Sequence, residues 1–334
     1  MASEHRHVAL LPSGLVFGVA AQRDLLSAAA SAGINVPAAC RNGVCELCEA
    51  RLRAGRALNT RNQQTIEVGE RLMMCRSIAL TDLELEISAV MAAGNNQPGK
   101  FQAKVVEVRS ISHDVYRVEL QLPRRRELSF HAGQYLSVNL PDAEPCYFSI
   151  ASSPSARNIE LHIQATPEWV SAQKVIDALT SGGEVTLELP HGKACLASAP
   201  AKPLLLVAAG TGFAQMKSLV DYLRETSYDQ PVKLYWGVRR HEDMYLRALA
   251  QQWQEEWPRF TFLPVVGDDE DNDWAGHHDQ LVRAVLASGM DWSSVEVHAS
   301  GSPTMVYTLM DALVEAGLPE SAFFSDVLEY APRA

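Results

Sequence analysis

The 334-residue sequence lacks several features that would place it in a special class of protein. It has no apolar run near the roughly 18–20 residues that a membrane-spanning helix needs, so we expect no membrane partner. Lys and Arg number 29 against 40 Asp and Glu, and the net charge of −11 argues against nucleic-acid binding. The N-terminal residues lack the charged-then-apolar plan of a secretion signal. We therefore expect a cytoplasmic protein.

Cysteine is scarce, with six residues, but four of them form one pattern. Cys40, Cys45 and Cys48 are spaced C-x4-C-x2-C, and Cys75 follows after 26 further residues. In a cytosolic chain of this length, clustered cysteines indicate metal or redox chemistry before disulfides. Four thiolates with this spacing hold a plant-type [2Fe–2S] cluster, and Gly43 fits a loop position that needs positive φ. A tetrahedral zinc site is the alternative, although such sites usually have two short C-x2-C pairs.

The first part of the chain, residues 1–92, has the pattern of a small β-grasp domain. Two short apolar stretches flank a Pro-Ser-Gly turn at 12–14, which indicates a hairpin. Asp24 then precedes apolar residues at helical spacing that end at Gly33. Alternating strands follow the cysteine loop. Residues 93–100 are rich in Gly, Asn, Gln and Pro, and we expect a linker there.

Residues 101–199 contain short strand-like segments at intervals of about ten residues. Strands at this spacing, separated by turn residues, predict a closed antiparallel β-barrel with one helix at 171–183. The predicted strands are 101–108, 115–120, 133–140, 147–152, 159–165 and 184–190.

Residues 200–334 alternate continuous apolar strands with helices, which predicts an α/β domain with a parallel sheet. Its first strand ends at Gly210-Thr211-Gly212, directly before a helix. Glycines at such a turn let a pyrophosphate approach the backbone at the helix N-terminus. A glycine turn is weak evidence by itself, because any tight strand–helix connection can use one.

The chain resembles known families over nearly its whole length. Residues 7–90 resemble a plant-type [2Fe–2S] ferredoxin domain, with Cys40, Cys45, Cys48 and Cys75 on the four ligand positions. Residues 101–199 resemble the flavin-binding barrel of the ferredoxin–NADP reductase superfamily, and residues 203–334 resemble its NAD(P)-binding half. The resemblance implies a multidomain protein with a [2Fe–2S] cluster, FAD (or FMN) and NADH or NADPH.

In the barrel, the resemblance rests on the motifs HAGQYLSV, FSIASSP, ELHI and PHG. It implies that the FSIAS strand runs along the isoalloxazine ring and that the Ser149 hydroxyl bonds the ring near N5. Cys146 replaces the arginine that the family uses for the flavin phosphate, and 167–171 lacks the family's glycine, so we expect a loosely held flavin. The implied flavin-binding residues are Tyr147, Phe148, Ser149, Ile150, Ala151, His162, Ser171 and Gly192.

In the nucleotide half, the resemblance implies that Ser300 stands where the family has a cysteine close to the nicotinamide. Ser149 and Ser300 are therefore the predicted catalytic residues. Arg239 or Arg240 is a candidate for the 2′-phosphate of NADPH, but nearby Glu242 and Asp243 favour NADH. The implied nucleotide- and flavin-contacting residues are Gly210, Thr211, Gly212, Trp236, Gly237, Arg239, Gly301, Met305 and Asp326.

The domain order is that of reductases of the phenol hydroxylase type and of CDP-6-deoxy-Δ3,4-glucoseen reductases, and the barrel is similar to NAD(P)H:flavin oxidoreductases. The resemblance implies that electrons pass from NAD(P)H through flavin and cluster to an electron-acceptor protein, an oxygenase, dehydrase or carrier. A flavin reductase that releases reduced flavin is the first alternative, and a degenerate redox-sensing module is the second. We expect a monomer.

Overall fold

A computed structural model describes residues 5–34, 36, 43–44, 46, 48–87, 98–123, 130–267 and 279–333. The ligand candidates Cys40 and Cys45, and most of the predicted linker 93–100, lie outside these described residues. The chain forms two compact units, Met1–Asn96 and Gln97–Ala334. Within the described residues, no helix combines the length and apolar character needed to span a bilayer.

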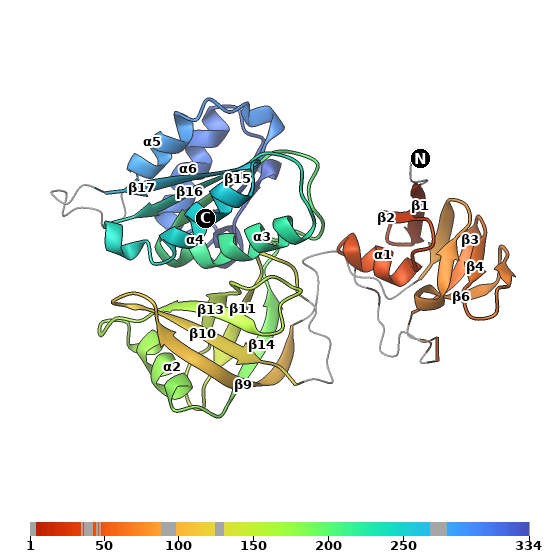
Figure 1. The fold of residues 1–334 in the computed structure, drawn as a ribbon, viewed down its shortest axis with the longest axis horizontal. Helices are drawn as coiled ribbons and strands as arrows, with labels where there is room; N and C mark the ends of the chain where they lie inside the picture. The colour runs from red at the N-terminus through yellow and green to blue at the C-terminus, as the bar shows by residue number, and fades with distance from the viewer. Residues whose placement is uncertain are drawn as a thin grey trace. The chain divides into compact units, whose positions relative to one another are not determined.

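The first unit is a β-grasp fold, as the sequence predicts (Figure 1). Its main sheet has the order β2-β1-β8-β3-β6, with β1 and β8 parallel, and a second sheet has the order β5-β4-β7. Helix α1 (Leu25–Ser31) begins where the Asp24 carboxylate accepts from the Ser27 N–H at 2.8 Å. The strands are β1 (His5–Leu11), β2 (Leu15–Ala20), β3 (Glu49–Ala54), β4 (Ala57–Asn59), β5 (Thr65–Ile66), β6 (Arg71–Met73), β7 (Ser77–Ala79) and β8 (Leu83–Glu86).

The second unit begins with the predicted antiparallel barrel. Its strand order is β12-β11-β14-β9-β10-β13, and a bridge between Ile150 and Leu161 joins the two ends. Helix α2 (Val170–Thr180) buries Val175, Ile176 and Leu179 in the barrel core. The strands are β9 (Gly99–Ser110), β10 (Val115–Gln121), β11 (Tyr135–Asn139), β12 (Cys146–Ser149), β13 (Ile159–Gln164) and β14 (Glu184–His191).

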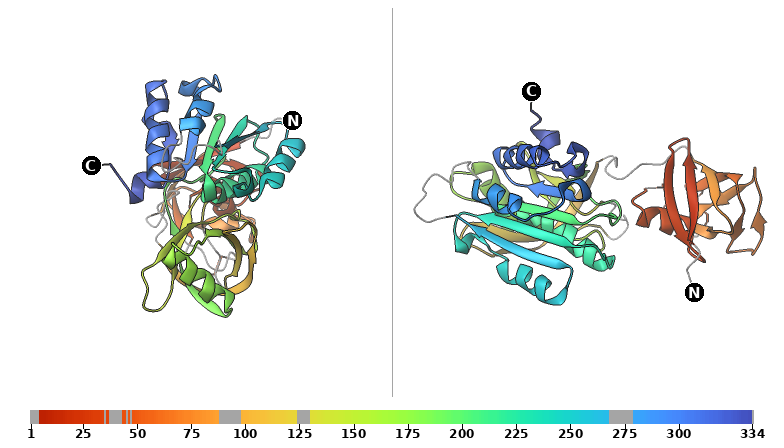
Figure 2. Two further views of the ribbon diagram at one scale, coloured as in Figure 1. Left: turned by 90° about the vertical axis from the view of Figure 1, so that its left-hand side faces the viewer. Right: turned by 90° about the horizontal axis from the view of Figure 1, so that it is seen from above.

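The same unit ends with a parallel α/β domain whose sheet has the order β17-β16-β15-β18-β19. Side chains of a strand alternate between the two faces. In β15, Leu204 and Leu206 therefore pack on the side of α3 and α4, whereas Leu205 and Val207 pack on the side of α5 and α6 (Figures 1 and 2). This double burial explains the continuous apolar strands. The strands are β15 (Leu204–Ala209), β16 (Val232–Val238), β17 (Phe260–Val266), β18 (Glu296–Ser300) and β19 (Phe323–Phe324), and the helices are α3 (Phe213–Glu225), α4 (Arg247–Glu256), α5 (Asp279–Leu286), α6 (Pro303–Glu315) and α7 (Val327–Tyr330).

Helix α3 joins the barrel to the α/β domain within the second unit. Gln215 donates to the Gly133 carbonyl at 2.7 Å, and Ser218 donates to the Ser152 carbonyl at 2.7 Å.

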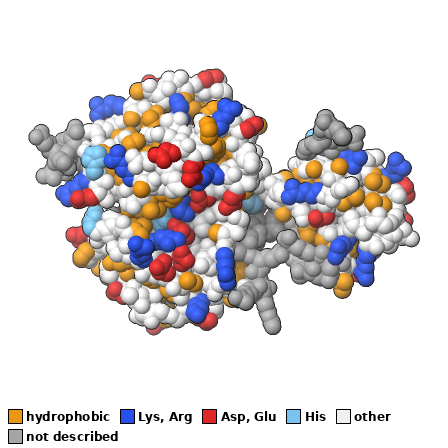
Figure 3. Space-filling model, viewed as in Figure 1, with side chains coloured by type: hydrophobic (Ala, Val, Ile, Leu, Met, Phe, Trp, Pro, Cys, Tyr) orange, Lys and Arg blue, Asp and Glu red, His pale blue; other side chains and the backbone are white. Residues whose placement is uncertain are grey.

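On the face seen in Figure 3, acidic and basic side chains of this unit are interspersed. That face offers no broad basic surface of the kind that nucleic acids bind.

Candidate functional site

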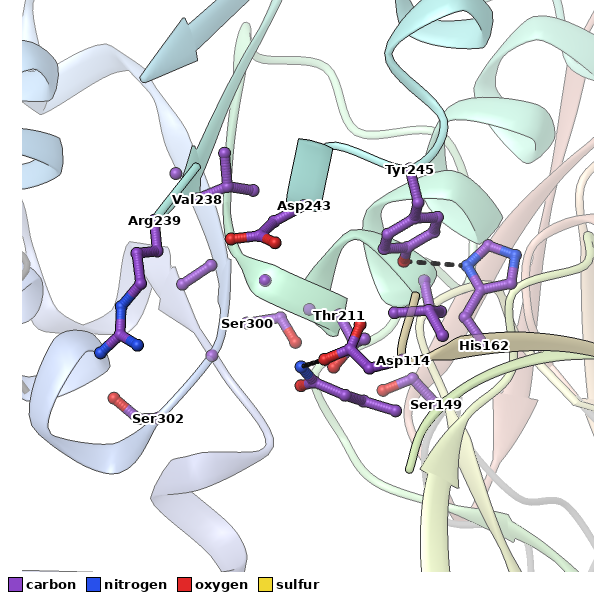
Figure 4. A pocket seen from close by; sticks show the side chains of 18 of the residues that line it. Asp114, Ser149, His162, Thr211, Val238, Arg239, Asp243, Tyr245, Ser300 and Ser302 are labelled. Atoms are coloured by element: carbon purple, nitrogen blue, oxygen red, sulfur yellow. Dashed lines mark hydrogen bonds between the residues drawn. The ribbon is translucent and has the colours of Figure 1, made fainter. Parts of the chain in front are cut away.

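A cavity of about 940 Å³ lies where three strands of the parallel sheet end. Its α/β wall includes the segments 209–212, 237–240 and 300–302, at the ends of β15, β16 and β18. Strand order reverses between β15 and β18, the position where open α/β sheets bind ligands. The barrel supplies the opposite wall, which includes Ser149 and His162 (Figure 4).

The glycine turn at this edge is closely packed, which explains why it needs glycine. Gly210 has a φ of +54°, and a Cβ at Gly212 would lie 2.2 Å from the Ser300 carbonyl oxygen. Trp236 is buried beneath the turn, and its Nε1–H donates to the Gly210 carbonyl at 2.9 Å. Helix α3 begins at Phe213, so its free N–H groups lie at this edge.

Gly237, Arg239 and Gly301 lie in the neighbouring segments at the ends of β16 and β18. A Cβ at Gly301 would lie 2.5 Å from the Met305 side chain, and one at Gly237 would lie 2.9 Å from Leu281. Both glycines therefore allow close packing of the wall. The exposed Arg239 lines the cavity and points toward the Ser302 side (Figure 4). The next residue, Arg240, has its Nη1 atom 3.6 Å from Glu242 Oε1.

A second cavity of about 740 Å³ adjoins the first. Phe148 and Ser149 from β12 line both cavities, as do Ser300 and Gly301 from the end of β18. The two predicted catalytic serines therefore lie at the junction of the two spaces. The second cavity is lined by Tyr135, Tyr147, Phe148, Ser149, His191, Gln215, Ser300, Gly301, Ser325, Asp326, Val327 and Tyr330.

Some of the predicted flavin-binding residues do not line the smaller cavity. Ile150 and Ala151 are fully buried, and Ile150 belongs to the barrel core. Ser171 is exposed in the first turn of α2, where the preceding Trp169 lines the larger cavity instead. Gly192 has a φ of +90° and lies under the smaller cavity.

Asp326 is a buried carboxyl group in the wall of the smaller cavity. Its Oδ2 accepts from the Gln215 amide at 2.9 Å. Burial, together with the charge of Glu329, raises the pKa of Asp326 to about 8, although hydrogen bonds from Ala194 and Gln215 oppose the shift. Asp326 therefore carries a proton at neutral pH.

The smaller cavity fits a flat heteroaromatic ligand such as a flavin. His191 stacks on Tyr135 with ring centroids 5.4 Å apart, and Tyr147 meets both rings edge-on. Within the described part of the chain, His191 Nε2 and Asp326 Oδ1 are buried without a hydrogen-bond partner. A ligand with ring nitrogens and carbonyl groups would satisfy these two atoms.

The phosphate side of the expected flavin site lacks positive charge from β12. Cys146 is partly buried, and its Sγ lies 3.9 Å from the Glu144 carbonyl oxygen. Burial raises the pKa of the Cys146 thiol, so this group stays neutral. Asp114 lines the larger cavity, which adds negative charge on the barrel side (Figure 4).

In the first unit, the described cysteines of the cluster motif lie inside the fold. Cys48 is 1% exposed and Cys75 is 8% exposed. The Met74 N–H donates to the Cys48 carbonyl at 3.0 Å, which ties the segment of Cys75 to that of Cys48. Gly43 has a φ of +82°, as expected for a loop that wraps a cluster.

Comparisons with known proteins match this architecture. Family models match residues 8–80 as a 2Fe-2S iron-sulfur cluster binding domain, 102–195 as an oxidoreductase FAD-binding domain and 206–310 as an oxidoreductase NAD-binding domain. Reductase component 2 of terephthalate 1,2-dioxygenase from Comamonas sp is 31% identical over 329 residues, which is 96% of each chain. The CDP-6-deoxy-L-threo-D-glycero-4-hexulose-3-dehydrase reductase of Yersinia pestis is 29% identical and covers 96% of this chain and 97% of its own. The NAD(P)H-flavin reductase of Aliivibrio fischeri is 31% identical over 59% of this chain and 85% of its own.

The fold and the two adjoining cavities thus define a flavin- and nicotinamide-dependent oxidoreductase joined to an iron–sulfur domain. The chain belongs to the family of ferredoxin-fused reductases that combine 2Fe-2S, FAD-binding and NAD-binding domains. The family-model matches confirm the predicted [2Fe–2S], FAD and nicotinamide cofactors. They favour an iron–sulfur cluster over the alternative of a zinc site.

Several residues of the site were not anticipated from the sequence. Gln215, His191, Tyr135 and Tyr245 all line a cavity. His191 and Tyr135 lie within the motifs PHG and HAGQYLSV, but neither was singled out as a site residue. Gln215 lies in α3 and Tyr245 in a turn before α4, and their role depends on what the fold brings next to them.

Proposed function

We propose that this oxidoreductase takes electrons from NADH and passes them, through FAD and the [2Fe–2S] cluster, to a separate acceptor protein. The observation that carries the proposal is the junction of the two cavities at Ser149 and Ser300. There, a nicotinamide bound against the glycine turn and a flavin bound against β12 would meet. When bound, the flavin and the cluster supply the conversion of a two-electron donor into a one-electron outlet.

The residues at this junction position the reactants and hold a proton. Ser149 lies on the wall shared by both cavities, and its hydroxyl would be a hydrogen-bond donor to a ring held there. Asp326, neutral at pH 7, offers a proton at the unpartnered Oδ1. Phe148 and Tyr147 provide apolar surface that excludes water from one side of the ring.

The choice of NADH over NADPH depends on charge at the mouth of the larger cavity. Arg239 is available to a 2′-phosphate, but Arg240 lies beside Glu242, and the Asp243 carboxylate accepts from the Arg240 N–H at 2.9 Å. Asp243 also lines the cavity. A carboxylate at this place repels a further phosphate more than it affects an unphosphorylated ribose.

Two relatives act in systems whose names identify an acceptor: a terephthalate 1,2-dioxygenase and a hexulose-3-dehydrase. By analogy, the proposed partner is an oxygenase or dehydrase component. The monomeric state, the cytoplasmic location, the residue roles and the domain limits 1–92, 101–199 and 200–334 stay predictions.

The decisive experiment is an anaerobic titration of the purified protein with NADH and with NADPH. We expect loss of the flavin and cluster absorption, together with the electron paramagnetic resonance signal of a reduced [2Fe–2S] cluster. A Cys75→Ser variant is the matched control, in which flavin is still reduced but reduction of a one-electron protein acceptor is lost. A cluster that stays oxidised under excess NADH contradicts the proposal and favours a degenerate sensing module.

Cys146 favours a second candidate function, the release of reduced flavin as a product. The family's phosphate-binding arginine is absent at this position, and the relatives include an NAD(P)H-flavin reductase. Gel filtration followed by flavin quantitation separates the two functions. Flavin retained at one equivalent per chain excludes release, whereas flavin lost on the column and recovered activity on adding free flavin supports it.

A further inference from the structure

A continuous series of side-chain contacts leads from barrel strand β13 to the glycine turn of the α/β domain. Its central residue is Tyr245, in the segment that follows β16 (Figure 4). The Tyr245 hydroxyl lies 3.1 Å from His162 Nδ1, and the two rings meet edge-on at 5.3 Å. His162 belongs to β13, so this bond crosses from one domain of the unit to the other.

On the barrel side, His162 is held by a buried carboxylate. His162 Nε2 lies 2.8 Å from Glu160 Oε1. Glu160 is in turn flanked by Arg117 at 3.2 Å and Lys217 at 3.5 Å. Two cations beside one carboxylate keep it charged in spite of its burial, and a charged acceptor fixes the position of its donor.

The protonation states of Glu160, His162 and Tyr245 determine which group is the donor in each hydrogen bond of this series. Burial opposes the charge of Glu160, but the hydrogen bond with His162 and the charge of Lys217 outweigh it and lower the pKa of Glu160 to about 2. Burial lowers the pKa of His162 and raises that of Tyr245. A neutral His162 therefore donates from Nε2 to Glu160 and accepts at Nδ1, which leaves Tyr245 O–H as the donor.

On the α/β side, Tyr245 packs against the aromatic residues that support the glycine turn. Its ring meets Trp236 edge-on at 5.2 Å and Phe213 at 6.0 Å. Trp236 and Phe213 stack on each other at 3.8 Å. Trp236 also holds the Gly210 carbonyl at 2.9 Å, so the series ends on the backbone of the turn.

This connection lies outside α3, as does the pair of His113 Nε2 and Asp243 Oδ1 at 3.9 Å. The hydrogen bonds of Gln215, Lys217 and Ser218 with the barrel all come from α3. Contacts along one helix permit rotation about that helix. Tyr245 lies in a different segment, and a contact away from the helix axis opposes such rotation.

We propose that Tyr245 is a positioning residue that, through His162, sets the distance between the glycine turn and the flavin strand β12. The inference rests on the proposed function, because it concerns how a nicotinamide and a flavin are brought together. Reactions that depend on the alignment of two bound groups lose up to about a hundredfold in rate for a misplacement of about 1 Å. The expected role is in alignment and not in direct contact with the reacting atoms.

The test compares Tyr245→Phe with Tyr228→Phe in the purified full chain. Both substitutions remove one buried hydroxyl hydrogen bond and keep the ring. Tyr228 donates to the Lys202 carbonyl and, among the described residues, makes no side-chain hydrogen bond with a barrel strand. The first measurement is amide hydrogen exchange in a peptide covering 209–214, without nucleotide. We expect exchange to be at least about threefold faster in Tyr245→Phe only, since a freed turn opens more often.

The second measurement is flavin reduction by saturating NADH in a stopped-flow instrument, with the long-wavelength charge-transfer absorption of the stacked rings as a spectroscopic signature. We expect the rate to fall about tenfold and the absorption to weaken in Tyr245→Phe, while Tyr228→Phe matches the native protein.

Exchange or rate within twofold of native in Tyr245→Phe overturns the inference, as does an equal change in Tyr228→Phe. If NADH fails to reduce the flavin of the native protein, the proposed function is wrong, while the exchange measurement still reports on Tyr245.

Discussion

The buried carboxyl group of Asp326 leads to a quantitative prediction about stability. Its side chain is buried in the wall of the smaller cavity, with Glu329 as a nearby like charge. These surroundings raise its pKa from 3.8 to about 8 in the folded protein. Asp326→Asn is nearly isosteric, still accepts from Gln215, and cannot ionise.

The direction and size of the pH effect on the free energy of unfolding follow from proton binding. Above pH 3.8 the unfolded chain releases the Asp326 proton, whereas the folded chain keeps it until about pH 8. The native free energy of unfolding therefore falls as pH rises through this window, by about 1.36 kcal/mol for each pH unit. Over two pH units, from 5 to 7, the stability difference between Asp326→Asn and native protein should grow by about 2.7 kcal/mol in favour of the variant.

Urea unfolding at pH 5, 6 and 7, followed by tryptophan fluorescence, measures this difference. All six tryptophans lie after residue 97, so the signal reports on the reductase unit alone. Asp142→Asn is the control, since Asp142 is an exposed turn residue with a φ of +56°, where asparagine is well accommodated. Parallel pH profiles for native protein and Asp326→Asn would refute the argument. We also expect slower flavin reduction in Asp326→Asn, because the amide cannot supply the proton.

Three further substitutions test charge at the site. Cys146→Arg should lower the flavin dissociation constant about tenfold to a hundredfold, since one hydrogen bond to a charged group contributes about 1.5–3 kcal/mol; fluorescence titration that shows unchanged affinity contradicts this. Glu160→Gln should destabilise the protein by about 3 kcal/mol at pH 7, because the pKa of Glu160 is lowered from 4.5 to about 2 and its charge stabilises the fold above pH 4.5. This loss should fall below half by pH 3 in urea unfolding, and a loss that does not shrink there counts against the Glu160 network. Arg239→Gln should raise the KM for NADPH about tenfold and leave that for NADH within twofold in steady-state assays, and equal changes for both would remove Arg239 from phosphate recognition.

Features encoded by short stretches of chain could be predicted well. The six barrel strands and the alternation of buried strands with helices depend on periodicity and on nearby residues, and the structure has them at closely similar positions. Gly210 is another such case, because its φ of +54° is one that residues with a Cβ rarely adopt. Local sterics act within a few residues, so the sequence records them directly.

Placement at the level of single side chains was harder to predict. The FSIAS motif as a whole was assigned to the flavin, but side chains alternate along a strand. Ser149 therefore faces the cavities, while Ile150 lies in the barrel core. Trp236 was expected to contact a cofactor, and the structure buries it beneath the glycine turn instead.

By itself, the sequence determined the fold class, the order in which the iron–sulfur, FAD-binding and NAD-binding domains follow one another, and the kind of cofactors. Only the tertiary structure decided that Asp326 is neutral, that His162 joins Tyr245 across two domains, and that Ser149 and Ser300 line the same cavities. These properties depend on burial and on contacts between residues tens to more than a hundred positions apart. Such contacts leave no periodic or local pattern in a single sequence, because they arise only when the barrel and the parallel sheet pack against each other.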